Sequence, residues 1–153
     1  MKICGVEIKG SEAVVCLLNY QDGLFTLPEC RVRKVEFNKR NSTGDLRYFQ
    51  ATFKKLMSDY SVEQVVIKER PLKGKFAGGA LGFKMEAAIQ CIDGLEVDTM
   101  SPQVFKEAIK RNPITVSFSE TGLKVFQEAA FNVAFAKHMN LQYPPPPPSS
   151  ELL

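Results

Sequence analysis

Apolar residues recur along this chain with two different periods, and the change from one to the other separates the predicted elements. Residues 2–9 and 11–18 are rich in β-branched side chains and are joined at Gly10, which suits a tight turn. Residues 31–37 alternate polar and apolar side chains, as a half-exposed strand does. The N-terminal part therefore predicts a three-stranded antiparallel meander.

Helical spacing of apolar residues begins after the capping residues at 41–45 and then alternates with strand-like runs. Ser101 and Pro102 form a typical helix start, with a capping side chain followed by a proline at the first helical position. Ser119 is a plausible cap for the last helix. The first predicted helix starts within residues 41–45 and ends at 59, and the others span 80–92, 102–111 and about 120–139. The strands between them span 62–69 and 95–98.

This order, three antiparallel strands and then β-α-β-α-β, predicts an α/β fold with a mixed five-stranded sheet flanked by helices. In such a sheet the first strand is central and runs parallel to the strand at 62–69, so the two C-terminal ends meet at one edge. Glu7 lies near the end of the first strand, and Glu69 ends the other. An unpaired carboxylate is costly to bury, so each acid is a site residue or part of an ion pair, unless Glu7 is a solvated residue of an edge strand. The cations available for such pairs include Lys9, Lys68 and Arg70.

Composition indicates the class of protein and the cellular compartment in which we expect it. Of the 153 residues, 44% are hydrophobic and 24% charged, as in an ordinary folded domain. No apolar stretch approaches the roughly 18 residues of a membrane span, and no signal peptide is recognisable, so we expect a cytoplasmic protein with reduced thiols and no membrane partner. The net charge of +3 permits a polyanionic partner without requiring one. The only histidine, His138, has no nucleophile motif with it and is predicted to interact with a helix dipole.

We divide the chain into a single domain at 1–140 and a Pro-rich tail at 141–153. Five consecutive prolines at 144–148 cannot continue a helix and favour an extended polyproline II conformation. A disordered terminus is the simpler interpretation of this tail. Docking on an aromatic groove of a partner is the alternative.

Four segments together resemble one known family. Ile3–Gly10 is similar to an opening strand with an apolar-Gly-apolar-acid stretch closed by Gly, and Val65–Glu69 resembles a fourth strand that ends in a catalytic Glu. Val97–Lys106 is similar to a strand that leads into a Pro-initiated helix, and Gln127–Ala136 resembles an Ala-rich last helix that contributes one or two acids. These are features of the ribonuclease H-like superfamily, and within it of RuvC-type Holliday-junction resolvases and small uncharacterised RuvC-like bacterial proteins. The resemblance covers most of residues 2–140 and implies a ribonuclease H-like fold.

The resemblance implies that Glu7, Glu69 and Glu128 converge to hold divalent metal, Mg²⁺ or Mn²⁺. Asp98 is a substitute carboxylate for the same cluster. Such cations require several anionic oxygens, and together they activate water and stabilise the leaving oxygen in phosphodiester cleavage. The chain has Glu where the family's first-strand and last-helix acids are Asp, and Phe131 stands where a second last-helix acid is usual. The implied function is a metal-dependent nuclease or resolvase-like protein. The alternative is a catalytically decayed module that binds nucleic acid or protein.

A basic, glycine-rich loop at 70–79 follows Glu69 directly. Its cations suit phosphate contacts, and its aromatic ring could stack on a base. The residues expected to bind nucleic acid are Arg70, Lys73, Lys75 and Phe76. A flexible, solvated loop is the alternative. Since RuvC-type resolvases are dimers, the resemblance also allows a homodimer.

Overall fold

Strands and helices alternate along the chain in the order that the apolar pattern predicts. The computed structural model describes residues 1–71 and 79–147. Two short 3₁₀ turns, Phe118–Thr121 and Val125–Gln127, precede the last helix. The elements are β1 (Lys2–Lys9), β2 (Glu12–Gln21), β3 (Leu24–Thr26), β4 (Lys34–Glu36), α1 (Thr43–Asp59), β5 (Gln64–Lys68), α2 (Ala80–Gln90), β6 (Glu96–Met100), α3 (Pro102–Arg111) and α4 (Glu128–Gln142).

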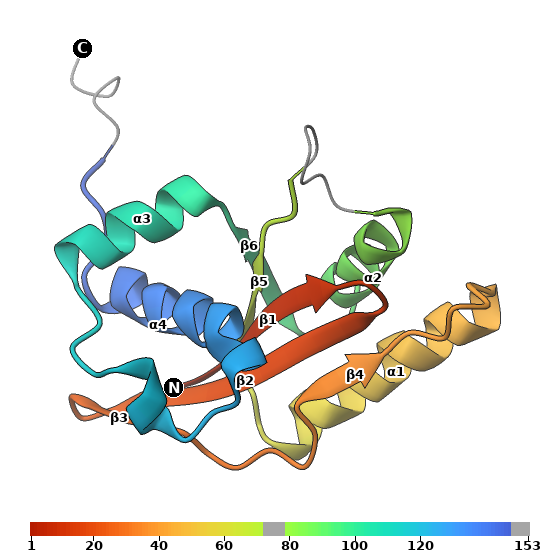
Figure 1. Ribbon diagram of the computed structural model, residues 1–153, viewed down its shortest axis with the longest axis horizontal. Helices are drawn as coiled ribbons and strands as arrows, with labels where there is room; N and C mark the ends of the chain where they lie inside the picture. The colour runs from red at the N-terminus through yellow and green to blue at the C-terminus, as the bar shows by residue number, and fades with distance from the viewer. Residues whose placement is uncertain (72–78, 148–153) are drawn as a thin grey trace.

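The sheet is mixed, and β1 lies at its centre (Figure 1). β1 pairs antiparallel with β2 on one side and parallel with β5 on the other, and β6 extends the parallel part. In the parallel register Val6 is opposite Ile67. This confirms the predicted α/β fold with a central first strand and places the ends of β1 and β5 together, at what we call the C-terminal edge of the sheet.

The predicted third strand is wrong in its extent. Instead of one strand at 31–37, two three-residue strands pair with β2, β3 at its end and β4 at its start, so the described sheet has six strands and not five. The connection between them contains Pro28, which has no N–H to donate to a ladder. Because β2 is ten residues long, it accommodates both short strands along the same side.

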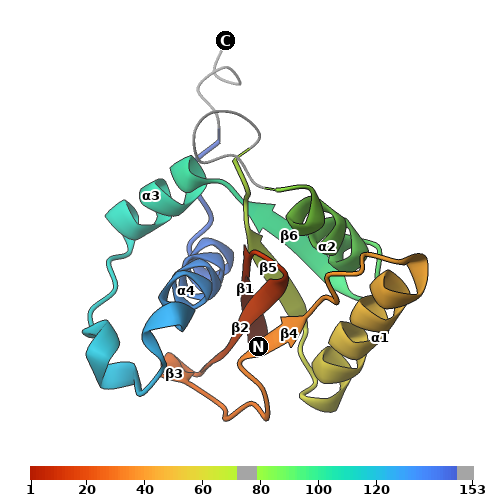
Figure 2. The ribbon, with the colours of Figure 1, turned by 45° about the vertical axis from the view of Figure 1, so that its right-hand side comes forward.

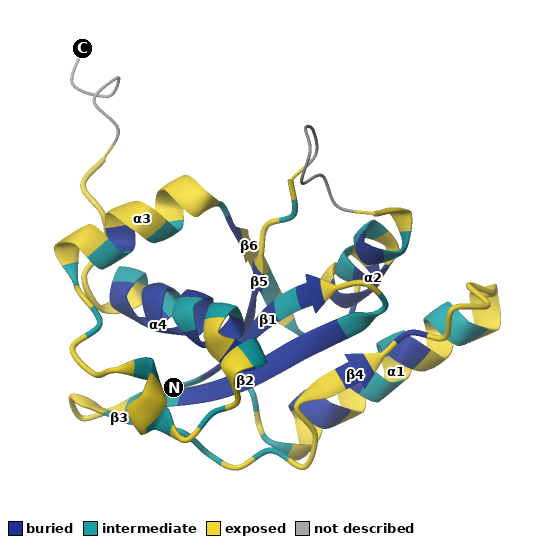
Figure 3. Cartoon of the chain, in the orientation of Figure 1, coloured by how far each residue is buried: buried dark blue, intermediate teal, exposed yellow. Residues whose placement is uncertain are grey.

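Helices cover both faces of the sheet, and each face has its own hydrophobic core. Figure 2 shows α1 and α2 on one side of the strands and α3 and α4 on the other. Side chains alternate between the two cores along each strand: Ile67 belongs to the α1–α2 core, and Val66 to the α3–α4 core. Buried residues accordingly concentrate in β1, β2 and α4 (Figure 3).

α4 lies unusually close to β1, and two polar side chains set its direction. A Cβ at Gly5 would be 1.8 Å from the carbonyl oxygen of Ala130, so only glycine fits at this crossing. The Gln127 amide donates to the Val15 carbonyl at 3.0 Å, and His138 Nε2 lies 2.8 Å from the Leu18 carbonyl oxygen. Val15 is level with Val6 and Leu18 with Ile3 in the β1–β2 register, so α4 runs antiparallel to β1 and begins near the C-terminal edge.

His138 therefore does not serve a helix dipole as predicted. Its side chain is buried and contacts a carbonyl of β2, and burial is the main cause of the lowered pKa of its imidazole. The neutral ring donates through Nε2 when that nitrogen carries the proton. The single histidine is thus a packing residue of the α4–β2 contact.

Helix starts follow the sequence where a capping side chain is present. Ser42 and Asp45 form a capping box at α1, and Ser101 caps α3 with Pro102 behind it, as predicted. The last helix starts later than predicted, at Glu128 and not near residue 120, because Gly122 adopts a left-handed conformation that separates the two 3₁₀ turns. It also continues to Gln142, past the predicted boundary at 140.

The tail is described only as far as Pro147. Residues 144–147 are exposed and lie in no helix or strand. The remainder of the predicted disordered tail lies outside the described residues. No helix among those described is long and apolar enough to cross a membrane.

Candidate functional site

Glu7 lies on the α4 face of the sheet at the C-terminal edge, and it is paired with two cations. Its side chain is only 13% exposed. One carboxylate oxygen is 3.3 Å from Lys68 Nζ, and the other is 3.7 Å from Lys9 Nζ. Lys68 reaches Glu7 because Val6 is opposite Ile67, so the next residue of each strand projects from the same face. The cluster carries two positive charges and one negative charge.

Glu69 reaches the same edge of the sheet but faces the other way. It follows β5 directly, its side chain is exposed, and its N–H donates to the Met100 carbonyl at 2.9 Å. Strand alternation turns Glu69 toward α2, where its negative charge contributes to the raised pKa of Glu86. The two acids that the sequence places side by side therefore lie on opposite faces of the sheet.

Glu128 and Asp98 come from α4 and β6, which are other elements than the strand of Glu7. Glu128 is the exposed first residue of α4, at the end of that helix nearest the C-terminal edge. Asp98 is level with Val66 in β6, and its carboxylate is 2.8 Å from Lys137 Nζ. Across residues 1–71 and 79–147, no group of three or more acidic, His or Cys side chains is arranged to hold a metal ion.

Phe131, at the position of the missing acid, is a core residue. Its side chain is buried, and its ring centroid is 6.0 Å from that of Phe118 and 6.4 Å from that of Phe135. The described residues therefore do not match a site for Mg²⁺ or Mn²⁺, which requires several anionic oxygens around one point. The charged groups paired with Glu7 are the ammonium groups of Lys68 and Lys9 and not a second carboxylate.

Arg70, predicted to contact nucleic acid, is packed into the fold at the base of the basic loop. Its guanidinium donates to the Ile8 carbonyl at 2.6 Å and lies 5.5 Å from the centre of the Phe83 ring. A Cβ at Gly82 would be 2.3 Å from the guanidinium carbon. Arg70 thus ties the start of the loop to β1 and α2. The other predicted contacts, Lys73, Lys75 and Phe76, lie outside the described residues.

Glu86 of α2 lies near Arg70 on the α2 face of the sheet. Burial is the largest cause of the raised pKa of the Glu86 carboxyl, the nearby charge of Arg70 opposes it, and Glu69 adds to it. The Oε2 atom of Glu86 and the Nε atom of Arg70 are both buried without a hydrogen-bond partner among the described residues. Glu86 is a further acid near this edge that sequence reasoning missed, and no spacing in the sequence links it to Glu7 or Glu69.

A small cavity on the α4 face adds residues that the sequence did not single out. Its volume is about 200 Å³, and it lies between the ends of β5 and β6 and the first turns of α3 and α4. Apolar side chains such as Met100 and Phe105 form much of its wall. Its polar lining comes from Lys68, Ser101, Lys106 and Asn132. Since Lys68 both lines this cavity and pairs with Glu7, the lysine joins the two into one surface.

Comparison with solved structures places this architecture in the ribonuclease H-like class. RuvC from Thermus thermophilus superposes with a TM-score of 0.70 at 12% identity, covering 93% of this chain and 96% of that one. T. thermophilus RuvC in complex with a Holliday junction substrate gives 0.67 at 12% identity, covering 94% and 96%. At this identity the likeness shows the fold alone, which is ribonuclease H-like.

The family of the chain follows from its sequence. Residues 1–137 match the family described as protein of unknown function (DUF3010), and the chain belongs to that family. A comparison with curated proteins gives no match.

Proposed function

We propose that this chain binds the phosphate backbone of nucleic acid at the C-terminal edge of the sheet, on the α4 face, without a catalytic metal ion. The observation that carries the proposal is the pairing of Glu7 with Lys9 and Lys68. A site built to hold divalent cations concentrates negative charge, whereas this cluster has one positive charge in excess. Lysine side chains at a surface edge are the groups that neutralise phosphates.

The arrangement suits exchange of one anion for another. Lys68 is 47% exposed on its side chain and Lys9 is 59% exposed, so both ammonium groups can reach a phosphate without unfolding a strand. Lys106 lines the adjacent cavity from α3 and offers a third cation on the same face. The likeness to RuvC, one structure of which contains a Holliday junction, supports branched DNA as the first substrate to test.

Binding is tested by fluorescence anisotropy with a four-way DNA junction, duplex DNA, single strands and an RNA–DNA hybrid, all in a chelator. Lys68→Met and Lys106→Met should each weaken binding and reduce the slope of log affinity against log salt by about 1. Lys54→Met is the matched control, because Lys54 is exposed on α1, on the opposite face of the sheet. No binding to any of these ligands at low salt, or equal losses in the control, would reject the proposal.

Metal-dependent cleavage is the second candidate, and the position of Glu7 favours it. Glu7 is a little-exposed acid at the end of the central strand, where the resembled family has its first catalytic acid. In this alternative Glu7, Glu69 and Glu128 are the ligands. Cleavage of any of the same substrates in Mg²⁺ or Mn²⁺ that is lost in Glu7→Gln would establish the alternative and exclude a role restricted to binding.

One substitution separates the two candidates without any nucleic acid. Lys68→Glu places a second carboxylate next to Glu7. If Lys68 fills a ligand position, this variant should gain Mn²⁺ binding that the natural chain lacks, as measured by titration calorimetry. Measurable Mn²⁺ binding by the natural chain, lost on Glu7→Gln, would instead show that the acids assemble around the ion.

A further inference from the structure

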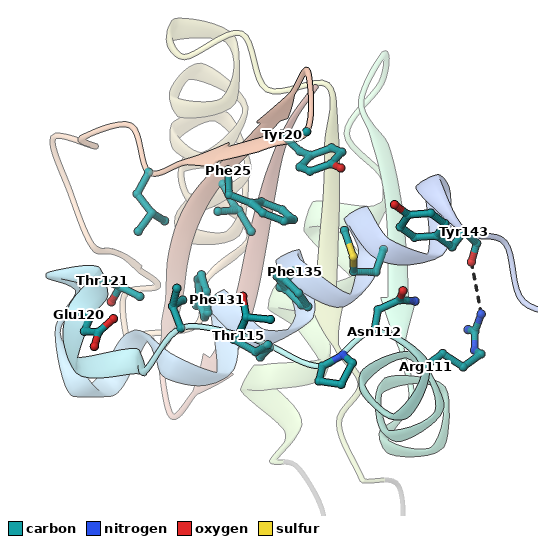
Figure 4. A pocket seen from close by; sticks show the side chains of 17 residues that line it. Tyr20, Phe25, Arg111, Asn112, Thr115, Glu120, Thr121, Phe131, Phe135 and Tyr143 are labelled. Atoms are coloured by element: carbon teal, nitrogen blue, oxygen red, sulfur yellow. Dashed lines mark hydrogen bonds between the residues drawn. The ribbon is translucent and has the colours of Figure 1, made fainter.

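A second, larger cavity lies on the α4 face at the opposite end of the sheet from Glu7. Its volume is about 690 Å³, within the range of ligand sites in proteins. It lies between the end of β2, β3, α4 and the segment that follows α3 (Figure 4). We call it the aromatic pocket, because five aromatic side chains line it: Tyr20, Phe25, Phe131, Phe135 and Tyr143.

The aromatic pocket combines an apolar wall with unused hydrogen-bond donors. The Phe25 and Phe135 rings are 5.1 Å apart, and Tyr20 lies 4.5 Å from Phe25. Figure 4 shows Tyr20, Asn112 and Tyr143 around the same space. Neither tyrosine hydroxyl nor the Asn112 side-chain amide has a hydrogen-bond partner among the described residues. An apolar occupant that carries hydrogen-bond acceptors would contact the rings and could accept from these hydroxyl and amide groups.

The chain itself contains such a segment. Five consecutive prolines begin at Pro144, immediately after Tyr143. Proline has no N–H, and in the polyproline II conformation its carbonyls are not used internally. Pro-rich segments of this kind dock in aromatic-lined grooves because their conformation is already fixed before binding. The proline run therefore matches the aromatic pocket in its apolar surface and in its free carbonyl acceptors.

The described part of the run, Pro144–Pro147, does not lie in the pocket of its own chain. Tyr143 lines the pocket, and its carbonyl accepts from Arg111 at 3.3 Å, which fixes the point of departure. Figures 1 and 2 show Pro144–Pro147 leading away from the end of α4, and these residues are exposed. A polyproline II helix rises about 3.1 Å per residue and is stiff over several residues. A return into the adjacent pocket would need a reversal within the run itself.

We propose that the proline run beginning at Pro144 docks in the aromatic pocket of a second copy of this chain, and that two copies exchange their runs reciprocally. Such an exchange is isologous and closes with two-fold symmetry. Once one run is docked, the second docks at a high effective concentration. The aromatic pocket is at the opposite end of the sheet from Glu7, so the dimer leaves both C-terminal edges free. The inference is independent of the proposed nucleic-acid binding.

Light scattering of the purified full chain tests the proposal. The natural chain should be a dimer, and a chain that ends at Tyr143 should be a monomer of unchanged fold by circular dichroism. Phe25→Glu, which puts a charge into the pocket, should also give a monomer, and Asn112→Ala should weaken the dimer while leaving the apolar wall intact. Tyr48→Ala is the matched control, because Tyr48 is 74% exposed on α1, outside the pocket, and this variant should remain a dimer.

Mixing two variants distinguishes exchange from any other interface. The truncated chain keeps a functional pocket, and Phe25→Glu keeps a functional run, so an equimolar mixture should form a one-to-one complex although neither forms a dimer alone. A monomeric natural chain, a dimer that survives truncation, or a mixture that stays monomeric would each overturn the proposal. A labelled peptide of residues 143–153 should bind the truncated chain and not its Phe25→Glu form.

Discussion

At the C-terminal edge, the two faces of the sheet differ in how their charged side chains are exposed and paired. On the α4 face, Glu7 is paired with Lys9 and Lys68, whose side chains remain about half exposed. On the α2 face, Arg70 is packed against Gly82, and Arg70 Nε and Glu86 Oε2 are buried with no hydrogen-bond partner within residues 1–71 and 79–147. The two ammonium groups on the α4 face are open to solvent and can reach an external anion, whereas the Arg70 guanidinium is held by its packing on α2 and by the Ile8 carbonyl. The proposed ligand site therefore uses the solvent-facing cations of the α4 face, whereas Arg70 on the α2 face anchors the start of the loop.

One glycine on each face of the sheet shows how much room the helix packing leaves for a side chain. A Cβ at Gly5 would meet the backbone oxygen of Ala130 at 1.8 Å, and one at Gly82 would meet the tip of the Arg70 side chain at 2.3 Å. A backbone oxygen within a helix cannot move without moving the helix, whereas a long side chain can rotate away. We therefore expect an added methyl group to cost more stability on the α4 face than on the α2 face.

We expect the largest loss in the free energy of unfolding from Gly5→Ala. The added methyl group must push α4 away from β1, and overpacking of this kind costs about 3 kcal/mol or more when the neighbour is backbone. Urea denaturation followed by circular dichroism measures the loss in the free energy of unfolding. Gly44→Ala is the control. A Cβ at Gly44 would be 3.8 Å from its nearest neighbour, Ser42 Oγ, and alanine is favoured over glycine at this helical position. Equal stability of Gly5→Ala and the natural chain would show that α4 does not sit this close to β1.

The next effect concerns the buried polar contact between α4 and β2. His138→Ala leaves the Leu18 carbonyl without its partner and should cost about 1–3 kcal/mol at neutral pH. Because burial lowers the pKa of His138 below its ordinary 6.5, the unfolded chain takes up the proton first as the pH falls. The contribution of His138 is therefore complete above about pH 6.5 and is lost in acid.

This pH dependence gives the measurement. Urea denaturation of the natural chain and of His138→Ala should show a stability difference that is greatest at neutral pH and shrinks below pH 6.5. A difference that grows in acid would mean that the histidine is charged in the folded protein, which its burial opposes.

The sequence predicted the fold well because continuous apolar runs mark the central strands, and capping residues with helical spacing mark the first helices. The central β1, the parallel β5 and the capped helices α1 and α3 all follow from apolar spacing and capping side chains. The short strands β3 and β4 and the 3₁₀ turns before α4 have too few residues to show a period. Their positions depend on the pairing with β2 and on the left-handed Gly122.

The candidate site was harder to predict, because it depends on a register of one residue. Val65, Val66 and Ile67 are all buried, so the strand shows no alternation that would assign its faces. A shift of one residue exchanges the two faces, and it decides whether Lys68 or Glu69 lies beside Glu7. Only the pairing of Val6 with Ile67 settles it in favour of Lys68. The positions of Glu128 and Glu86 depend on how α4 and α2 pack, which no local pattern encodes.

Gly82→Ala tests the α2 face and should have a smaller effect than Gly5→Ala. We expect a loss of about 1–2 kcal/mol, because the Arg70 side chain has to leave its place over α2. In an Arg70→Ala background the same change should stabilise the protein, since alanine is favoured over glycine within a helix by about 1 kcal/mol. Urea denaturation of both single variants and the double variant gives the coupling energy. Additive losses would show that Arg70 does not pack on Gly82.

The smallest effect is expected from Glu86→Gln, and its sign is informative. Burial raises the pKa of Glu86 more than the opposing charge of Arg70 lowers it, so the ionised carboxylate is disfavoured in the folded protein. The neutral carboxyl contributes stability below its ordinary pKa, and this contribution is lost as the pH rises. Glu86→Gln, neutral at every pH, should therefore equal or slightly exceed the natural chain at pH 7, within about 0.5 kcal/mol. The natural chain should gain on the variant as the pH falls toward 4.5. A clear loss of stability at neutral pH would instead mean that Glu86 and Arg70 form a productive ion pair, and the contrast between the two faces would disappear.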